Sequence, residues 1–132
     1  MIFNEEREPV YTRTYVSMFD SGLIREIGAG GYTVLSALAS FMNDEGECYP
    51  TQRQLAEMLG MSKTTVNNTI KKLLAVRVNG KPILTYEEHY NKRGYKNYKY
   101  KIHPVSQMAI FKSKSEFVDN TAKIYSVPIK NK

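Results

Sequence analysis

The sequence has few of the residues from which disulfides, metal sites and membrane spans are built. Its 132 residues include one cysteine, Cys48, and two histidines. A single cysteine excludes an internal disulfide and is typical of a reducing compartment. No apolar run approaches the length of a membrane span, and the first ten residues lack the charged and apolar regions of a signal peptide. We therefore expect a cytoplasmic protein without a membrane segment.

Acidic residues are scarce in the second part of the chain. Residues 1–50 carry eight acidic and three basic side chains, whereas residues 51–132 carry five acidic and sixteen basic ones. The net charge of +6 thus resides in the second part and favours a polyanionic partner, although a basic surface can also serve solubility alone. A nuclease would need clustered carboxylates or histidines, and neither the acidic residues nor His89 and His103 have such spacing. We expect no catalysis, no metal, no cofactor and no small-molecule ligand.

The stretch Thr51–Leu74, TQRQLAEMLGMSKTTVNNTIKKLL, has the pattern of two short helices separated by a tight turn. Thr51 and Gln54 have the spacing of a capping box, in which each side chain satisfies a backbone N–H at a helix start. Gly60 stands where the first helix must end, because glycine adopts the left-handed conformation without a steric penalty. Ser62 can then cap the second helix.

The second helix, Ser62–Leu74, has one apolar and one polar face. Val66, Ile70 and Leu73 recur at the spacing of a buried stripe, while amides, hydroxyls and amines on the free face suit base edges and phosphates. This pattern predicts a helix-turn-helix with this segment as recognition helix; the alternative is a helical hairpin whose polar face only meets water. The predicted DNA-binding residues of the two helices are Gln52, Arg53, Lys63, Thr64, Thr65, Asn67, Asn68, Lys71 and Lys72.

The chain before this pair supplies the core. Tyr32–Asn43, including Phe41, is apolar over so much of its circumference that we expect a central helix. A short helix with Leu23, Ile24 and Ile27 inward should precede it, and Gly28–Gly31 should separate the two as a flexible turn. The alternating Val10–Phe19 is interpreted as an edge strand or an extended arm, and Glu47–Tyr49 as a short strand.

Two strands are expected after the recognition helix, at Pro82–Tyr90 and Tyr95–His103. Tyrosines and basic residues alternate in the second, so one face can pack while the other stays charged. Such a strand can grip phosphates or stack on bases, although lysines on an edge strand can also serve only to prevent aggregation. A hairpin directly after a helix-turn-helix indicates a wing. Its predicted DNA-binding residues are Lys92, Arg93 and Lys96.

Residues 104–132 carry no recognisable motif. Ser106–Phe111 is interpreted as a helical turn and Lys123–Ile129 as a strand. The segment could be a dimerisation element, a linker to a further domain or a loosely packed tail, and a homodimer is left open. We expect an N-terminal arm over 1–14, a winged helix-turn-helix domain over 15–103 and an extension over 104–132. The fold class is mainly α with a small β-hairpin (α+β).

This order of elements resembles a winged helix-turn-helix domain. More narrowly, SALASFMNDEGECYPTQRQLAEMLGMSKTTVNNTIKKLL is similar to the domain of replication proteins of phages and plasmids of Gram-positive bacteria, and to small DNA-binding accessory proteins of conjugative elements. The resemblance implies a recognition helix in the major groove and a wing over the phosphate backbone or minor groove. It assigns these roles to Thr64, Asn67, Asn68 and Lys71, and to Lys92 and Arg93.

The function expected from this resemblance is sequence-specific binding of double-stranded DNA for a mobile genetic element. A transcriptional repressor, the DNA-binding fragment of a replication initiator and a winged helix that binds proteins are the alternatives. Replication initiators usually carry a further domain for helicase recruitment or oligomerisation, for which 132 residues leave no room.

Overall fold

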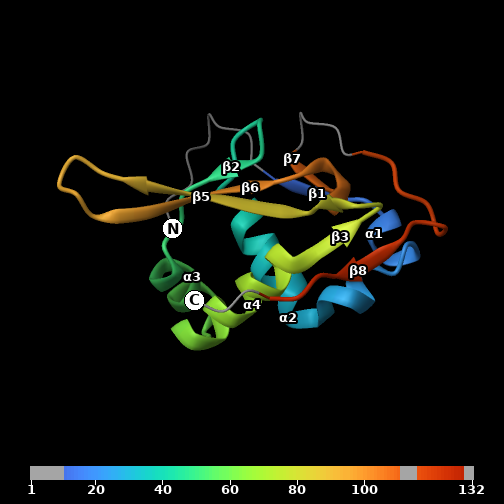
Figure 1. Ribbon diagram of the computed structural model, residues 1–132, viewed down its shortest axis with the longest axis horizontal. Helices are drawn as coiled ribbons and strands as arrows, with labels where there is room; N and C mark the ends of the chain where they lie inside the picture. Colours follow the sequence, from blue (N-terminus) through green and yellow to red (C-terminus); the bar gives the residue numbers. More distant parts are fainter. Residues whose placement is uncertain (1–10, 111–115, 130–132) are drawn as a thin grey trace, which may run out of the picture.

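The computed structural model describes residues 11–110 and 116–129. The longest strands lie on one side of the helices, two short strands lie beside the helices, and one long hairpin extends beyond them (Figure 1). The chain is therefore α+β, as the sequence predicts. The helices are α1 (Ser17–Asp20), α2 (Leu23–Ala39), α3 (Gln52–Leu59), α4 (Lys63–Ala75) and the 3₁₀ helix η1 (Pro104–Ser106).

The strands of the described residues form three small antiparallel sheets. Two of the sheets contain three strands and one contains two. The two-stranded sheet pairs β1 (Thr12–Thr14) with β7 (Met108–Ile110). The second sheet has the order β2 (Glu47–Cys48), β6 (Lys96–Ile102), β5 (Leu84–Tyr90). The third has the order β4 (Lys81–Pro82), β3 (Val76–Val78), β8 (Ile124–Ser126).

The glycine-rich segment forms a kink in α2 and not a turn, so the prediction of a flexible four-residue turn is wrong. Gly28 alone leaves the helical region, with φ 75° and ψ 173°, a conformation open mainly to glycine. The helix resumes at Ala29 and continues through Gly31. A Cβ on Gly31 would lie 2.9 Å from Ile27 Cβ and 3.5 Å from Leu73 Cδ2. The contact with Ile27 is too short for a side chain, so the kinked part of α2 needs glycine at position 31.

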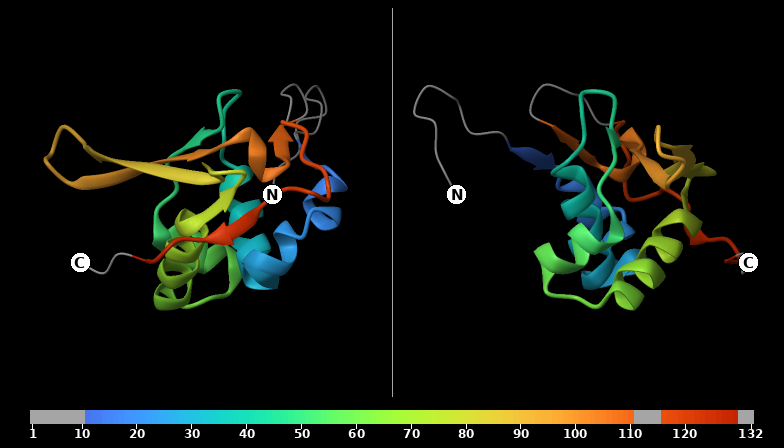
Figure 2. Two further views of the ribbon diagram at one scale, coloured as in Figure 1. Left: turned by 45° about the vertical axis from the view of Figure 1, so that its right-hand side comes forward. Right: turned by 90° about the vertical axis from the view of Figure 1, so that its left-hand side faces the viewer.

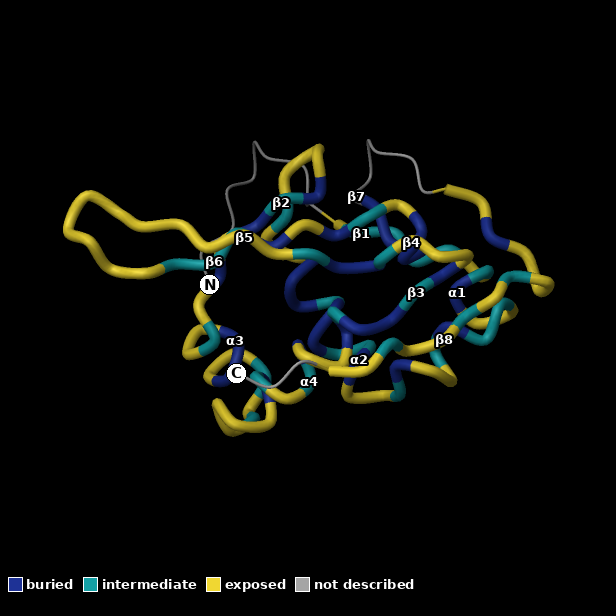
Figure 3. The backbone as a smooth tube through the Cα atoms, in the orientation of Figure 1, coloured by how far each residue is buried: buried dark blue, intermediate teal, exposed yellow. Residues whose placement is uncertain are grey.

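The core lies where α2, α3 and α4 face the strands (Figure 3). Leu38 of α2, Leu55 of α3 and Leu73 of α4 are fully buried, and burying a leucine contributes roughly 1.5–3 kcal/mol. Phe41 was predicted to belong to a core helix reaching Asn43. Because α2 ends at Ala39, Phe41 lies beyond the helix and is exposed, which corrects that prediction.

The chain after residue 103 packs against this same core. Val105, Met108 and Val118 belong to the main buried cluster, and β8 pairs with β3 beside α4 (Figure 2). The strand predicted at Lys123–Ile129 is therefore present in shorter form. Core contacts lie on both sides of the boundary that the sequence suggests after residue 103, and the division into a domain and an extension stays a prediction.

The helical turn predicted at Ser106–Phe111 is wrong over its described residues. The chain forms a 3₁₀ helix that begins two residues earlier, at Pro104, and Gln107, with φ 66°, ends that helix and directs the next residues into β7. Phe111 lies outside the described residues. The predicted arm over 1–14 is described only from residue 11, and Thr12–Thr14 of that arm form β1.

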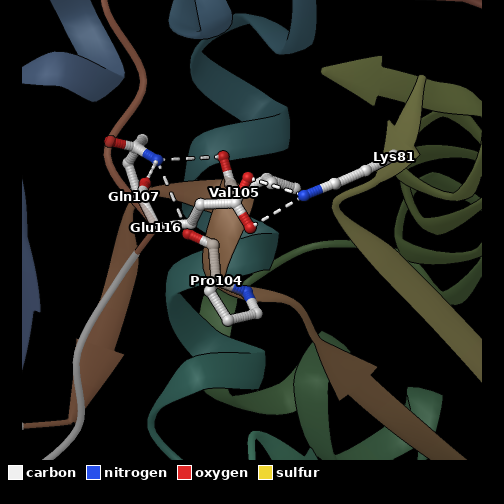
Figure 4. A network of polar contacts seen from close by, with 5 residues as sticks. All are labelled: Lys81, Pro104, Val105, Gln107 and Glu116. Carbon is white, nitrogen blue, oxygen red and sulfur yellow. Dashed lines mark hydrogen bonds and ion pairs between the residues drawn. The ribbon is translucent and has the colours of Figure 1, made fainter. Parts of the chain in front are cut away.

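Buried Gln107 holds the segment around η1 together (Figure 4). Its Nε2 donates to the carbonyl oxygens of Glu116, at 2.6 Å, and Val105, at 3.2 Å. Its Oε1 accepts a hydrogen bond from Ser17 Oγ of α1. Glu116 in turn forms an ion pair with Lys81 of β4, with Nζ–Oε2 at 2.9 Å. These contacts fix the chain after β6 against the side of the molecule opposite the hairpin tip.

Candidate nucleic-acid interface

The first helix of the predicted pair, α3, begins and ends at the residues that its sequence indicates. Thr51 Oγ1 accepts from the Gln54 N–H at 3.0 Å, and Gln54 Oε1 accepts from the Thr51 N–H at 2.8 Å, so the capping box is confirmed. Gly60 has φ 66° and donates its N–H to the Ala56 carbonyl. The two-residue turn Gly60–Met61 then leads to Ser62. Both ends of α3 are thus fixed by local chemistry.

The second helix, α4, is capped at both ends. Ser62 Oγ accepts from the Thr65 N–H at 3.0 Å, as predicted. At the other end Arg77 Nη1 donates to the carbonyls of Leu74, at 2.9 Å, and Val76, at 3.1 Å. A guanidinium at this position satisfies carbonyls that the helix leaves unpaired and complements the negative end of the helix dipole. Both ends of α4 are thus fixed by local contacts, and its buried residues pack with those of α2 and α3.

The polar face of α4 is turned to solvent. Val66, Ile70 and Leu73 are buried, which confirms the helical register. Asn67 is half-buried on the flank of the helix. The exposed residues of this face are Lys63, Thr64, Thr65, Asn68, Lys71 and Lys72. Hydroxyl, amide and amine groups therefore lie together on one rigid helical surface.

Two predicted residues of α3 have intramolecular partners. Gln52 is half-buried, and its Nε2 donates to Asn67 Oδ1 at 3.2 Å. The Tyr100 hydroxyl of β6 is also hydrogen-bonded to Gln52. Gln52 therefore links α3 to α4 and to the hairpin. Arg53 is exposed, and its Nε lies 3.8 Å from Glu57 Oε1 on the same helix, an ion pair of little strength in water.

The tip of the β5–β6 hairpin is shaped by Asn91. Its Oδ1 accepts from the N–H groups of Arg93, at 2.9 Å, and Tyr95, at 3.0 Å, while Gly94 has φ 82°. An asparagine side chain that bonds the backbone two residues on replaces a backbone turn. Lys92 and Arg93 are exposed at this tip. The tip projects from the end of the molecule where α3 and α4 lie (Figure 1).

Acidic partners on the hairpin reduce the positive charge that the sequence indicates there. Lys96 Nζ lies 3.3 Å from Glu88 Oε1 and 5.4 Å from the centre of the Tyr98 ring. Lys99 Nζ lies 3.1 Å from a Glu47 oxygen, which lowers the pKa of that carboxyl, and 3.5 Å from a Glu87 oxygen. The glutamates come from the neighbouring strands β5 and β2, so a search along the basic segment alone misses them.

Tyrosines form the face of the hairpin that turns toward α4. The strand register places Tyr86 opposite Tyr100, and Tyr98, two residues before Tyr100 on β6, lies diagonal to Tyr86. Ring centres of Tyr86 and Tyr98 are 5.6 Å apart, and those of Tyr98 and Tyr100 are 6.1 Å apart. The predicted alternation of a packed and a charged face is confirmed, because Tyr100 and Ile102 are buried whereas Lys101 is exposed.

Other kinds of site find little support in the part of the chain that the structure describes. Residues 11–110 and 116–129 contain no group of three His, Cys, Asp or Glu side chains that could hold a metal ion. Cys48 is buried, and desolvation raises the pKa of its thiol to about 12, which keeps the group protonated. Within the same residues, every helix is too short or too polar to cross a membrane.

Comparison with known proteins identifies one part of this arrangement. Residues 31–74 match a protein family described as a helix-turn-helix domain. The match covers the second part of α2, β2, α3 and most of α4, the helix that carries the exposed polar face. No curated protein and no solved structure matches the chain. This part of the chain is thus similar to a helix-turn-helix domain, a class of domain that is consistent with binding to double-stranded DNA.

Proposed function

We propose that the protein is a winged helix-turn-helix protein that binds specific sites on double-stranded DNA. In this proposal α4 enters the major groove and the β5–β6 hairpin is the wing on the phosphate backbone. The observation that carries it is the exposed face of α4, whose amide, hydroxyl and amine groups lie beside a projecting hairpin with Lys92 and Arg93 at its tip.

The dimensions of α4 support this docking. Its 13 residues give a length of roughly 20 Å at about 1.5 Å per residue, and a helix of this kind fits the major groove, which is about 12 Å wide. Its first turn presents Lys63, Thr64 and Thr65, and N-terminal residues of recognition helices contact base edges and phosphates. The hairpin reaches past the helices on the same side, where it can contact the backbone (Figure 1).

The biological setting that we propose is a mobile genetic element, and its support is the sequence resemblance of residues 36–74. Binding without catalysis suffices for accessory, initiator and repressor roles, and we place the chain among such DNA-binding proteins. The proposed partners are double-stranded DNA and, for site recognition with two half-sites, a second copy of the chain.

Footprinting on the DNA surrounding the protein's own gene tests site-specific binding. The proposal predicts one or a few protected sites whose affinity exceeds that of random duplex by at least about a thousandfold. Equal protection of all sequences would contradict site recognition. A protein that binds no duplex at all at low salt would instead favour a winged helix that binds other proteins.

A further inference from the structure

A cleft lies between α4 and the β5–β6 hairpin, on the flank of the exposed helical face. Its volume is about 470 Å³, within the range of roughly 300–1,000 Å³ typical of small-molecule sites. Ile70 and Leu74 of α4 form an apolar wall, and the chain at Val127–Ile129 lies on another side. Lys71 lines the cleft and is exposed, so the cleft reaches the surface that we assign to DNA.

One wall of the cleft is aromatic. Tyr86, Tyr98 and Tyr100 all line it, and only Tyr86 keeps a large exposed fraction, 40%. Its ring is supported edge-on by Tyr98, whose ring in turn meets buried Tyr100. A supported ring that is open on one side is a surface on which a planar ring can stack, and such stacking tolerates any base.

The remaining polar groups suit the edge and the phosphate of a nucleotide. Gln52 and Asn67 line the cleft, and the hydrogen bond between Gln52 Nε2 and Asn67 Oδ1 leaves the Gln52 oxygen as an acceptor and the Asn67 amine as a donor for a base edge. Lys71 and Arg77 supply positive charge. None of the described residues that line the cleft is acidic, so a phosphate meets no repulsion there.

We propose that this cleft binds one unpaired nucleotide of the DNA held by α4 and the hairpin. The base stacks on Tyr86, its edge meets the amides of Gln52 and Asn67, and the adjoining phosphate meets Lys71. This inference rests on the proposed function, because the duplex on α4 brings the strand to the cleft. An unpaired or mismatched nucleotide enters at the lowest cost, since its stacking and pairing are already lost.

Three duplexes of one length and sequence test the inference with the full chain. The first is fully paired, the second has a central mismatch of two nucleotides, and the third has abasic residues at those two positions. The mismatched duplex should bind about tenfold more tightly than the paired one, a gain typical of one stacked base. The abasic duplex should lose this gain, although it bends as easily. Equal affinity for the three DNAs, or a gain that persists in the abasic duplex, would overturn the inference.

Variants of Tyr86 test whether the tighter binding of the mismatched duplex arises in this cleft. Tyr86→Ala should reduce the ratio of mismatched to paired affinity to about one, and Tyr86→Phe, which keeps the ring, should restore it. Tyr49→Ala is the matched control, because Tyr49 is exposed, contacts His89 and lies outside the cleft. If the mismatched duplex still bound more tightly to the Tyr86→Ala variant, the base would bind elsewhere.

A free nucleotide, dAMP, tests whether the bound nucleotide belongs to a DNA strand. If dAMP bound as tightly as the mismatched duplex, the proposal that the nucleotide belongs to the bound DNA would be wrong. If the unmodified protein did not bind the paired duplex, the proposed function would be contradicted. Equal binding of the paired and mismatched duplexes would instead contradict only the proposal for this cleft.

Discussion

Asn67 and Asn68 are neighbours in the sequence and hold different positions on α4. Asn68 is exposed, and its side-chain amide makes no hydrogen bond to another described residue. Asn67 is half-buried, and its Oδ1 accepts from Gln52. An amide that pairs with both atoms of an adenine edge needs its donor and its acceptor free. The side chain of Asn68 therefore meets this requirement in the present structure, whereas Asn67 can meet it only if its hydrogen bond with Gln52 breaks.

The variant Asn68→Ala should lose preference for the cognate site and keep most non-specific binding. One paired contact to adenine separates the right base from a wrong one by about 1–3 kcal/mol. Because Asn68 is exposed, the free energy of unfolding should change by only about 0.5 kcal/mol. Thermal unfolding and affinity for cognate and scrambled duplexes are measured together. Unchanged discrimination with unchanged stability would show that sequence is read elsewhere.

Cys48 gives a second prediction at this scale. Burial raises the pKa of its thiol to about 12, above the ordinary value of 9.0, so the unfolded chain loses this proton at lower pH than the folded chain. Stability from the protonated thiol is therefore full below pH 9 and is lost as the pH rises toward 12. At pH 9 iodoacetamide should modify the folded protein at least about a hundredfold more slowly than the chain in urea. Similar rates would show that the thiol is accessible.

Local patterns predict residue roles only where the partner is near in the sequence. The caps of Thr51 and Ser62 were predictable because each acts within three residues. Gln52 was predicted as a DNA-binding residue, yet its partners Asn67 and Tyr100 lie 15 and 48 positions away, and only the folded chain brings them together. That assignment, like those of the other site residues, stays a prediction.

At the scale of elements, the kink of α2 shows what glycine-rich sequence can and cannot indicate. A run of glycines predicts a break in a helix, and the structure contains such a break within α2. Which glycine absorbs the break depends on how the two parts of α2 pack, and Gly28 alone does so. The strand β7 was missed for a related reason, because its pairing with β1 joins segments nearly a hundred residues apart.

Two glycines of α2 should respond oppositely to alanine. Gly28→Ala places a Cβ at φ 75° and should destabilise the protein by about 1–3 kcal/mol. Gly30 is helical and exposed, and no atom lies within 4 Å of a Cβ built there, so Gly30→Ala should stabilise it by about 0.4–1 kcal/mol. Urea unfolding of both variants gives the two values. If Gly28→Ala were neutral, the kink would not be a fixed feature of α2.

The hairpin tip should contribute affinity without selectivity. Lys92→Ala with Arg93→Ala removes two exposed charges that contact backbone in the proposed docking, so all duplexes should bind more weakly by similar factors. The control, Arg25→Ala with Lys123→Ala, removes two exposed charges from α2 and the segment before β8. It should weaken binding less. A loss of site preference in the tip variant would make the wing a reader of bases.

At the scale of the whole molecule, the charge is divided between two regions of the sequence. The helix-turn-helix and the hairpin fall in the basic part, residues 51–132, and the acidic residues concentrate in residues 1–50. This division was readable from composition. The pairing of Lys96 and Lys99 with glutamates on neighbouring strands was not, whereas the described lysines of α4 keep their exposed charge.

The salt dependence of duplex binding tests the central claim most directly. If α4 and the hairpin tip neutralise roughly 4–6 phosphates, a plot of log affinity against log salt should have a slope of about −4 to −5, at roughly −0.9 per phosphate. The tip variant should reduce the magnitude of that slope by about 2, and the control variant should leave it unchanged. A flat salt response in the unmodified protein would contradict DNA binding by this face.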